Sequence, residues 1–139
     1  MRTQVKRAFT LIEILIVVVI LGILAAIVIP QFTDASQQAN TSSAKSQLQT
    51  IRAQIELYRV KHNGSDPASL ATGTFDTLVN PGGTEPPYLH SAPVNPLQAS
   101  NTIANAAAAG VSWVWKTSNV NANVMDMYAV AADGTEAPW

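Results

Sequence analysis

Apolar residues are distributed very unevenly along this chain. From Phe9 to Ile29 they form a nearly continuous run, interrupted by Thr10, Glu13 and Gly22. A helix rises about 1.5 Å per residue, so this run is long enough for the roughly 30 Å hydrocarbon core of a bilayer. The pattern therefore predicts a membrane-spanning helix over residues 9–30.

Two other interpretations explain part of the run. A secretory signal peptide has a shorter apolar core followed by a small-residue cleavage site. Ala25 and Ala26 offer such a site, but the apolar run continues past them to Ile29, which argues against removal there. An ordinary single-span anchor explains the length of the run but leaves Glu13 without a reason, because a carboxylate inside a spanning helix costs about 2.5–3.5 kcal/mol.

After Pro30 the pattern changes to a single apolar stripe. Leu48, Ile51, Ile55 and Tyr58 recur at spacings of three and four residues, which predicts an amphipathic helix over residues 31–63. Its second half should pack against the protein's own sheet rather than against a partner. The Asn-Gly pair at 63–64 is a good stop signal, because glycine accepts the left-handed conformation that ends many helices.

Residues 64–139 form the expected globular head. The stretch 76–96 is rich in proline and leaves little room for long regular elements, and residues 98–110 are either a loop or a short Ala-rich helix. Residues 110–117 and 124–131 have strand-like patterns, and the turn-rich connection 118–123 joins them as an antiparallel hairpin. Trp113 or Trp115 on the first strand is expected to cover the helix stripe.

Charge adds an orientation. Arg2, Lys6 and Arg7 precede the apolar run, so the positive-inside rule places the N-terminus in the cytoplasm and the head outside. The formal net charge of −1 gives no reason to expect nucleic acid as a partner. The chain has no cysteine, so disulfides and thiolate metal sites are excluded.

The order of residues in "FTLIEILIVVVILGILAAIVIP", after a short basic leader, resembles type IV pilins and type II secretion pseudopilins. The resemblance implies that a prepilin peptidase removes residues 1–8 by cutting between Ala8 and Phe9, and that Phe9 is then N-methylated. The family normally has Gly before the cut, where this chain has Ala8. The implied fold is α+β and pilin-like, with a long N-terminal helix packed on a small antiparallel sheet.

The resemblance also gives Glu13 a role in assembly. In a filament, axial stagger can bring its carboxylate to the new α-amino group of Phe9 in a neighbouring subunit. Such a pair offsets much of the desolvation cost of the two charges and specifies register more than stability. Gly22 is either a tolerated small residue or a close-packing point between helices. Pro30 should bend or locally open the helix, as a boundary or as an extendable joint.

The implied function is that of a structural filament subunit, not an enzyme. Its implied partners are other copies of itself, the prepilin peptidase, an inner-membrane assembly platform with a cytoplasmic ATPase, and membrane lipid before assembly. The resemblance of "LYRVKHNGSDPASL" to major pseudopilins, the short head and the lack of cysteine favour a type II secretion pseudopilin of the bacterial inner membrane. A type IV pilin for adhesion, motility or DNA uptake is the alternative, and an anchored binding module that never polymerises is a second one.

Candidate chemistry in the head is sparse. His62 and His90 belong to no metal spacing or catalytic triad and are expected to be exposed polar residues. No cofactor is expected. The resemblance also implies a candidate calcium site, because major pseudopilins commonly hold calcium in a C-terminal loop. The carboxylates near the C-terminus of this chain are Asp126, Asp133 and Glu136. Ca²⁺ takes six to eight oxygen ligands, so three carboxylates are few for such a site.

Overall fold

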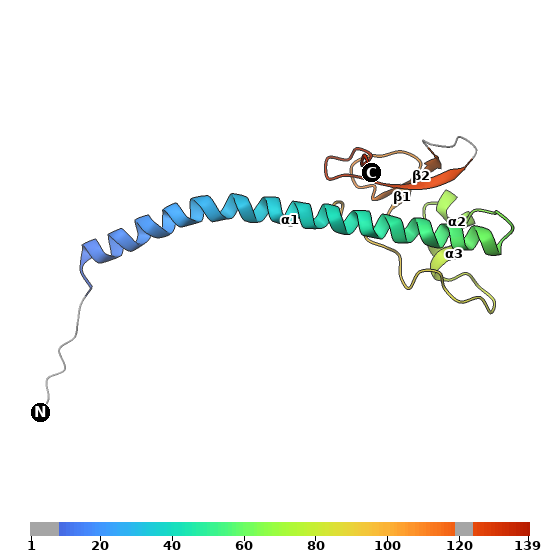
Figure 1. Cartoon of the computed structure of the whole chain (residues 1–139), viewed down its shortest axis with the longest axis horizontal. Coiled ribbons are helices and arrows are strands. Elements are labelled where there is room, and N and C mark those ends of the chain that lie inside the picture. The colour runs from blue at the N-terminus through green and yellow to red at the C-terminus, as the bar shows by residue number, and fades with distance from the viewer. Residues whose placement is uncertain (1–8, 119–123) are drawn as a thin grey trace, which may run out of the picture. The chain divides into compact units, whose positions relative to one another are not determined.

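The computed structural model describes residues 9–118 and 124–139 (Figure 1). In chain order the elements are α1 (Leu11–Lys61), α2 (Ala68–Ala71), α3 (Asp76–Val79), β1 (Ile103–Ala104), β2 (Trp113–Thr117) and β3 (Met125–Ala129). They divide into two compact units with a boundary after Gln38, inside α1. The combination of helix and sheet confirms the predicted α+β, pilin-like class.

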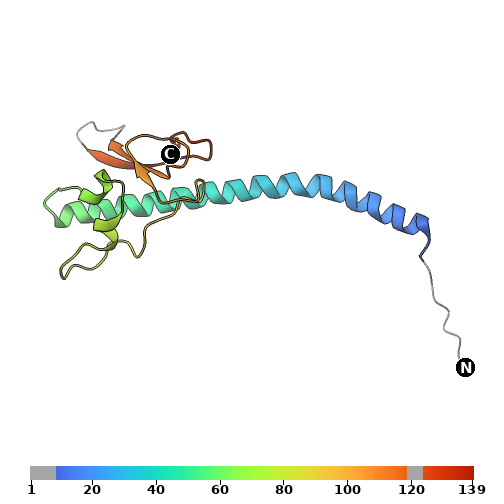
Figure 2. The same cartoon turned by 180° about the vertical axis from the view of Figure 1, so that it is seen from behind.

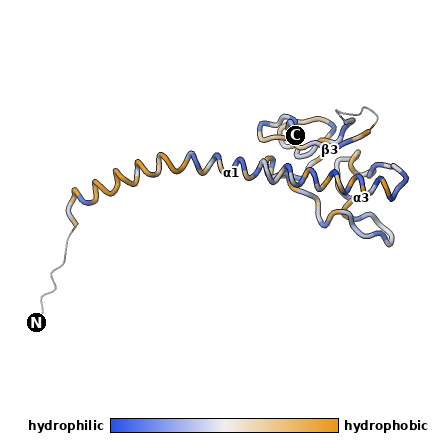
Figure 3. Tube along the Cα trace, in the orientation of Figure 1, coloured by the Kyte–Doolittle hydropathy of each residue, from blue (hydrophilic) through white to orange (hydrophobic). Residues whose placement is uncertain are grey.

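The first unit contains the N-terminal part of α1, in which residues 14–29 form an almost unbroken apolar run (Figure 3). Among the described residues α1 is the one helix long and apolar enough to cross a membrane, and none of that apolar window is buried within the chain. The ribbon curves over this part (Figure 1), and the helix continues without interruption through Pro30. Of the two expected effects of this proline, a bend or a local opening, the described helix contains no opening. The hydroxyl of Thr33 donates to the carbonyl of Ile29 (3.2 Å), which adds a hydrogen bond beside the proline.

The second unit is built on the C-terminal part of α1, where the predicted stripe is confirmed. Leu48, Ile51 and Ile55 are buried and Tyr58 is half-buried. They share one core cluster with both tryptophans of β2, since Trp113 and Trp115 are each buried. Figures 1 and 2, seen from opposite sides, both place the sheet along this part of the helix.

The predicted helix end is also confirmed to within two residues. α1 ends at Lys61, and Asn63 and Gly64 follow with φ of 55° and 85°. The Gly64 N–H donates to the carbonyl of Arg59 (2.7 Å), which satisfies one of the orphan carbonyls of the last turn. The short helices α2 and α3 follow, as the Pro-rich composition of this region allows.

The predicted hairpin of β2 and β3 is confirmed as an antiparallel pair in which Trp115 faces Met127. Most of its connection, residues 119–123, lies outside the described residues. The sheet is not purely antiparallel, however, because β1 pairs with β2 in parallel and the order is β1-β2-β3. A strand of two residues carries no periodicity, so the sequence could not reveal it within the undecided stretch 98–110.

One buried polar side chain joins the loop before β1 to the hairpin. Asn95 is fully buried, and its amide nitrogen donates to the carbonyls of Ser112 (2.8 Å) and Val130 (2.9 Å). Its side-chain oxygen accepts from the N–H of Leu97 (2.9 Å). An amide is needed here because a carboxylate has no hydrogen to donate to two carbonyls.

Candidate functional site

The expected processing site lies at the start of the described chain. Ala8 is outside the described residues, and Phe9 is 82% exposed. Regular helix begins at Leu11, two residues after the expected new N-terminus. The cut between Ala8 and Phe9 and the methylation of Phe9 stay predictions.

Glu13 forms a capping box with Thr10 in the single chain. The Thr10 N–H and hydroxyl both donate to Glu13 Oε2 (2.8 Å each), and the Glu13 N–H donates to the Thr10 hydroxyl (3.3 Å). Thr10 is the N-cap and Glu13 the third helical residue, the spacing at which such side chains satisfy the free N–H groups of the first turn. The carboxylate therefore already has local donors in a subunit without neighbours.

The surface that follows is apolar and uncovered by the rest of the described chain. Its large side chains, from Leu11 to Ile29, are all more than half exposed. A Cβ added at Gly22 would meet no atom within 4 Å, so nothing in the described part of the chain requires glycine there. A packing role for Gly22 needs another molecule, and the role of Pro30 in assembly likewise stays a prediction.

The three calcium candidates do not converge in the described part of the head. Asp126 Oδ1 lies 3.3 Å from Nε of Arg52, and Glu136 is paired with Lys116. Asp133 accepts from the N–H (2.9 Å) and hydroxyl (2.7 Å) of Thr135, which holds the pKa of its carboxyl below the usual range. Within residues 9–118 and 124–139, no group of three or more His, Asp or Glu side chains is arranged to hold a metal ion.

An aromatic and acidic cluster lies where α1 ends. His62 stacks on Tyr58 with 4.0 Å between ring centroids, and its Nε2 lies 3.2 Å from Glu85 Oε2. It is half-buried rather than exposed as expected, whereas His90 is exposed. The Tyr88 hydroxyl donates to Glu85, which lowers the pKa of that carboxyl, while burial and this hydrogen bond raise the pKa of Tyr88 to about 12.

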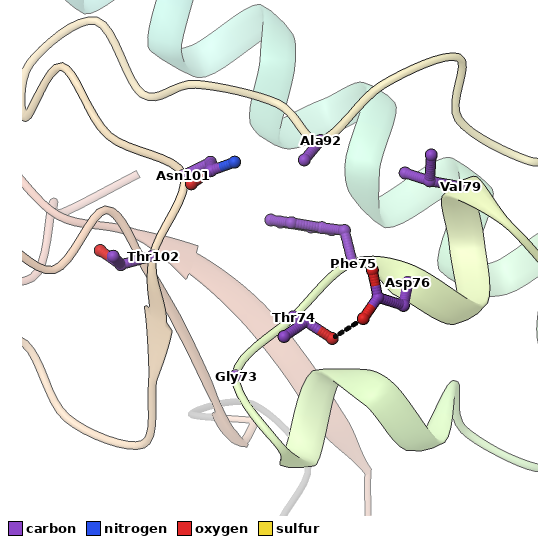
Figure 4. Close-up of a pocket in the computed structure, with 8 residues that line it drawn as sticks. All are labelled: Gly73, Thr74, Phe75, Asp76, Val79, Ala92, Asn101 and Thr102. Atoms are coloured by element: carbon purple, nitrogen blue, oxygen red, sulfur yellow. Dashed lines mark hydrogen bonds between the residues drawn. The ribbon is translucent and has the colours of Figure 1, made fainter.

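The head also contains a half-open pocket of about 290 Å³ beside α3 (Figure 4). It is lined by Gly73, Thr74, Phe75, Asp76, Val79, Ala92, Asn101 and Thr102. The Thr74 hydroxyl donates to Asp76 Oδ2 (3.1 Å). The lining offers one carboxylate and neither a histidine nor a basic residue, so it does not hold a triad of nucleophile, histidine base and orienting carboxylate.

Sequence reasoning missed four residues that organise these regions. Thr10 was visible in principle, because T-x-x-E before an apolar run is the signature of a capping box. The contacts that matter for Arg52, Arg59 and Asn95 carry no such signal, since each of these side chains donates to a backbone carbonyl far away in sequence.

Comparison with known proteins gives independent information. The model of the prokaryotic N-terminal methylation motif matches residues 4–29. The chain is 38% identical over 103 residues to type II secretion system core protein G of Pseudomonas aeruginosa, across 69% of this chain and 71% of that protein. That match is far longer than the motif and therefore includes part of the head.

Relatives of another kind match as well. The chain is 40% identical over 58 residues to a type IV narrow pilus major component of Thermus thermophilus, across 42% of this chain and 50% of that protein. It is 34% identical over 98 residues to a fimbrial protein of Pseudomonas aeruginosa, across 70% of this chain and 62% of that protein. No solved structure matches the chain.

Proposed function

The chain belongs to the pilin and pseudopilin family, whose members are membrane-anchored subunits that assemble into filaments, and from this premise we propose that it is a subunit of a type II secretion pseudopilus. The observation that carries the proposal is the 38% identity over 103 residues to core protein G, which extends beyond the shared N-terminal motif. The role is structural and not enzymatic, a proposal that rests on the similarity to pilin and pseudopilin subunits.

Processing is the first step of this function. A prepilin peptidase cuts between Ala8 and Phe9, and the new amine of Phe9 is methylated. The basic residues ahead of the cut hold the N-terminus in the cytoplasm, and the apolar part of α1 anchors the chain in the inner membrane. The head then lies on the periplasmic side, or outside the cell in a surface filament.

Assembly follows by extraction of the anchor into a helical filament, driven by a platform protein and its cytoplasmic ATPase. The capping box supports a two-state role for Glu13. Before assembly its carboxylate binds Thr10 of the same chain, and in the filament it pairs with the amine of Phe9 in a neighbour. The Glu13 carboxylate thus has hydrogen-bond donors both before and after assembly, and a charge without such partners would be costly in the bilayer interior.

We propose in addition that Asp126, Asp133 and Glu136 bind no calcium and that the head needs no cofactor. The basic partners of two of these carboxylates support this, because a cation would have to displace Arg52 and Lys116. An unchanged thermal midpoint of the head in calcium and in a chelator is the expected result. A rise with calcium that is lost in Asp133→Asn would contradict the proposal.

The test of the function is the intact mass of the protein in two fractions of its native cells, sheared surface material and washed envelope. A mass short by residues 1–8 and one methyl heavier, mainly in the envelope, is expected. The same species mainly in the sheared fraction would replace the secretion assignment by a surface pilus. A full-length mass in the envelope would contradict both and leave an anchored module that never polymerises.

The second candidate, a type IV pilin, is favoured by one specific observation. The identity to the narrow pilus component is 40%, slightly above that to core protein G, although over a shorter stretch. Loss of an exoprotein from the medium in a deletion strain supports the secretion role. Loss of surface fibres with normal secretion supports the pilin role instead.

A further inference from the structure

The outer edge of the sheet is formed by β3, the last strand in the order β1-β2-β3. Backbone groups of Val124 and Val130 face β2, since Ser118 N–H donates to Val124 O (2.6 Å) and Val130 N–H donates to Ser112 O (3.0 Å). Facing directions alternate along an antiparallel strand. The carbonyls of Met125, Met127 and Ala129 therefore point away from β2, toward the edge at which another strand could add.

Each of these three outward carbonyls already accepts a hydrogen bond. Nη2 of Arg59 donates to Met125 O, and Nε of Arg52 donates to Met127 O (2.9 Å). The N–H of Ala137 donates to Ala129 O (2.9 Å). Two of the three donors are thus side chains of α1 rather than a neighbouring strand.

An outward donor of the edge is occupied as well. The Met127 N–H donates to Asp126 Oδ1 (2.7 Å), and the same oxygen lies 3.3 Å from Nε of Arg52. Asp126 therefore connects the Met127 N–H to Arg52, the residue whose Nε donates to the Met127 carbonyl.

The two arginines are held in place from several sides. They are seven residues apart, two turns along the face of α1 that follows β3. Arg59 is paired with Glu56 and with Asp66 (2.6 Å), and these ion pairs raise the pKa of its guanidinium although burial alone would lower it. The guanidinium of Arg52 lies over the ring of Tyr128, 5.4 Å from its centroid.

We propose that Arg52 and Arg59 seal the outer edge of β3, so that a second copy of this chain cannot add its own β3 strand there. An open edge strand is a template for pairing with another chain, and natural proteins cover or charge such edges. A subunit that is concentrated in a membrane or a filament meets many copies of itself, which makes a sealed edge valuable. The proposal stands on the contacts of β3 and does not depend on which filament the chain builds.

The test compares two double variants of the full chain in detergent by light scattering across a concentration series. Arg52→Met with Arg59→Met removes both side-chain donors to the edge, and we expect concentration-dependent self-association. Arg52→Gln with Arg59→Met removes the same two charges, but the glutamine amide nitrogen stands where Arg52 Nε donated to Met127 O, and we expect weaker self-association than in the Met pair. Lys45→Met removes one positive charge from the same helix away from β3 and serves as a further control.

Two results would overturn the proposal. One is a Met pair that associates no more than the unchanged chain, and the other is an Arg52→Gln, Arg59→Met variant that associates as strongly as the Met pair, which would make charge repulsion the cause. Should the Met pair fail to fold, Arg52→Met and Arg52→Gln alone decide between the same outcomes.

Discussion

The two parts of α1 solve the same problem in different ways. Up to Ile29 the helix is apolar around nearly its whole circumference and the described chain covers none of that surface, whereas from Ala39 on it has one apolar stripe and buries it under its own sheet. Both parts are regular helix, so backbone structure does not distinguish them. What differs is the source of the cover: the second part finds it within the chain, and the first must find it in lipid or in other subunits.

This difference predicts which property a mutation in each part of α1 changes. A substitution in the second part changes the stability of the head, because its contacts are intramolecular. A substitution in the first part should leave the head unchanged and alter insertion or assembly. The following experiments try to break that division, beginning with the largest expected effect.

Truncation of a core side chain should separate the two parts most clearly. Trp113→Ala removes a fully buried ring that packs with the helix stripe, and we expect a loss of roughly 3–5 kcal/mol in the free energy of unfolding of the head. Ile20→Ala, an exposed position of the first part, should leave that free energy within about 0.5 kcal/mol of the original. Denaturant titration in detergent, followed by tryptophan fluorescence for Ile20→Ala and by circular dichroism for both, measures the two changes. A comparable loss from Ile20→Ala would break the division.

The buried amide of the head should come next. Asn95→Asp has nearly the same shape but cannot donate to Ser112 and Val130, and it places a carboxylate beside two carbonyls. We expect a loss of roughly 2–4 kcal/mol, measured by the same titration at neutral pH. Asn105→Asp makes the same chemical change at an exposed position and should cost little. Equal costs at the two positions would show that Asn95 does not tie the loop to the hairpin.

A smaller and strictly local effect is expected at the start of α1. Thr10→Val keeps the shape of the side chain but removes the hydroxyl from the capping box, so amides of the first helical turn should exchange about fivefold faster in micelles. Thr33→Val removes a hydroxyl that bonds within the helix and should leave those amides unchanged. The head should not respond to either change, and a shift of its unfolding midpoint in Thr10→Val would be evidence against independent behaviour.

The smallest effect concerns pH. The hydrogen bond from Tyr88, with help from His62 and Lys61, lowers the pKa of Glu85 in the folded head. A lowered folded pKa gives stability that is fully present above the ordinary carboxyl pKa of about 4.3 and is lost as pH falls through the folded value. Thermal midpoints between pH 7 and pH 3 should therefore decline less steeply at the acid end in Glu85→Gln than in the unchanged chain. Parallel curves would contradict the assignment.

Periodicity and composition predicted the elements that repeat a simple pattern. The stripe of Leu48, Ile51 and Ile55, the stop at Asn63 and the hairpin around Trp113 all follow from local spacing, and the structure contains them. Each of these signals is local, because one helix face or one alternating strand records its own burial.

The remaining features depend on contacts between distant parts of the chain. β1 has two residues, too few to show the alternation of a strand in the sequence, and its parallel pairing with β2 depends on the path of the connecting loop. On β3, Arg52 and Arg59 donate to carbonyls more than sixty residues away, and a carbonyl is present at every position of any sequence. At the candidate site, the apolar run and Glu13 stood out in the sequence, whereas the intrachain role of Glu13 became visible only with Thr10 beside it.

The most direct test of the account is the reactivity of single cysteines toward a charged, membrane-impermeant maleimide, which a chain without native cysteine makes unambiguous. Val18→Cys lies in the uncovered apolar part of α1, and Ser46→Cys on an exposed position of the second part. The account predicts that Val18→Cys stays unlabelled in the native envelope and in isolated filaments and reacts only after denaturation, while Ser46→Cys reacts in the envelope once the head side is made accessible. Labelling of Val18→Cys in both native fractions to the extent of Ser46→Cys would contradict it, because the first part of α1 would then have no cover from outside the chain.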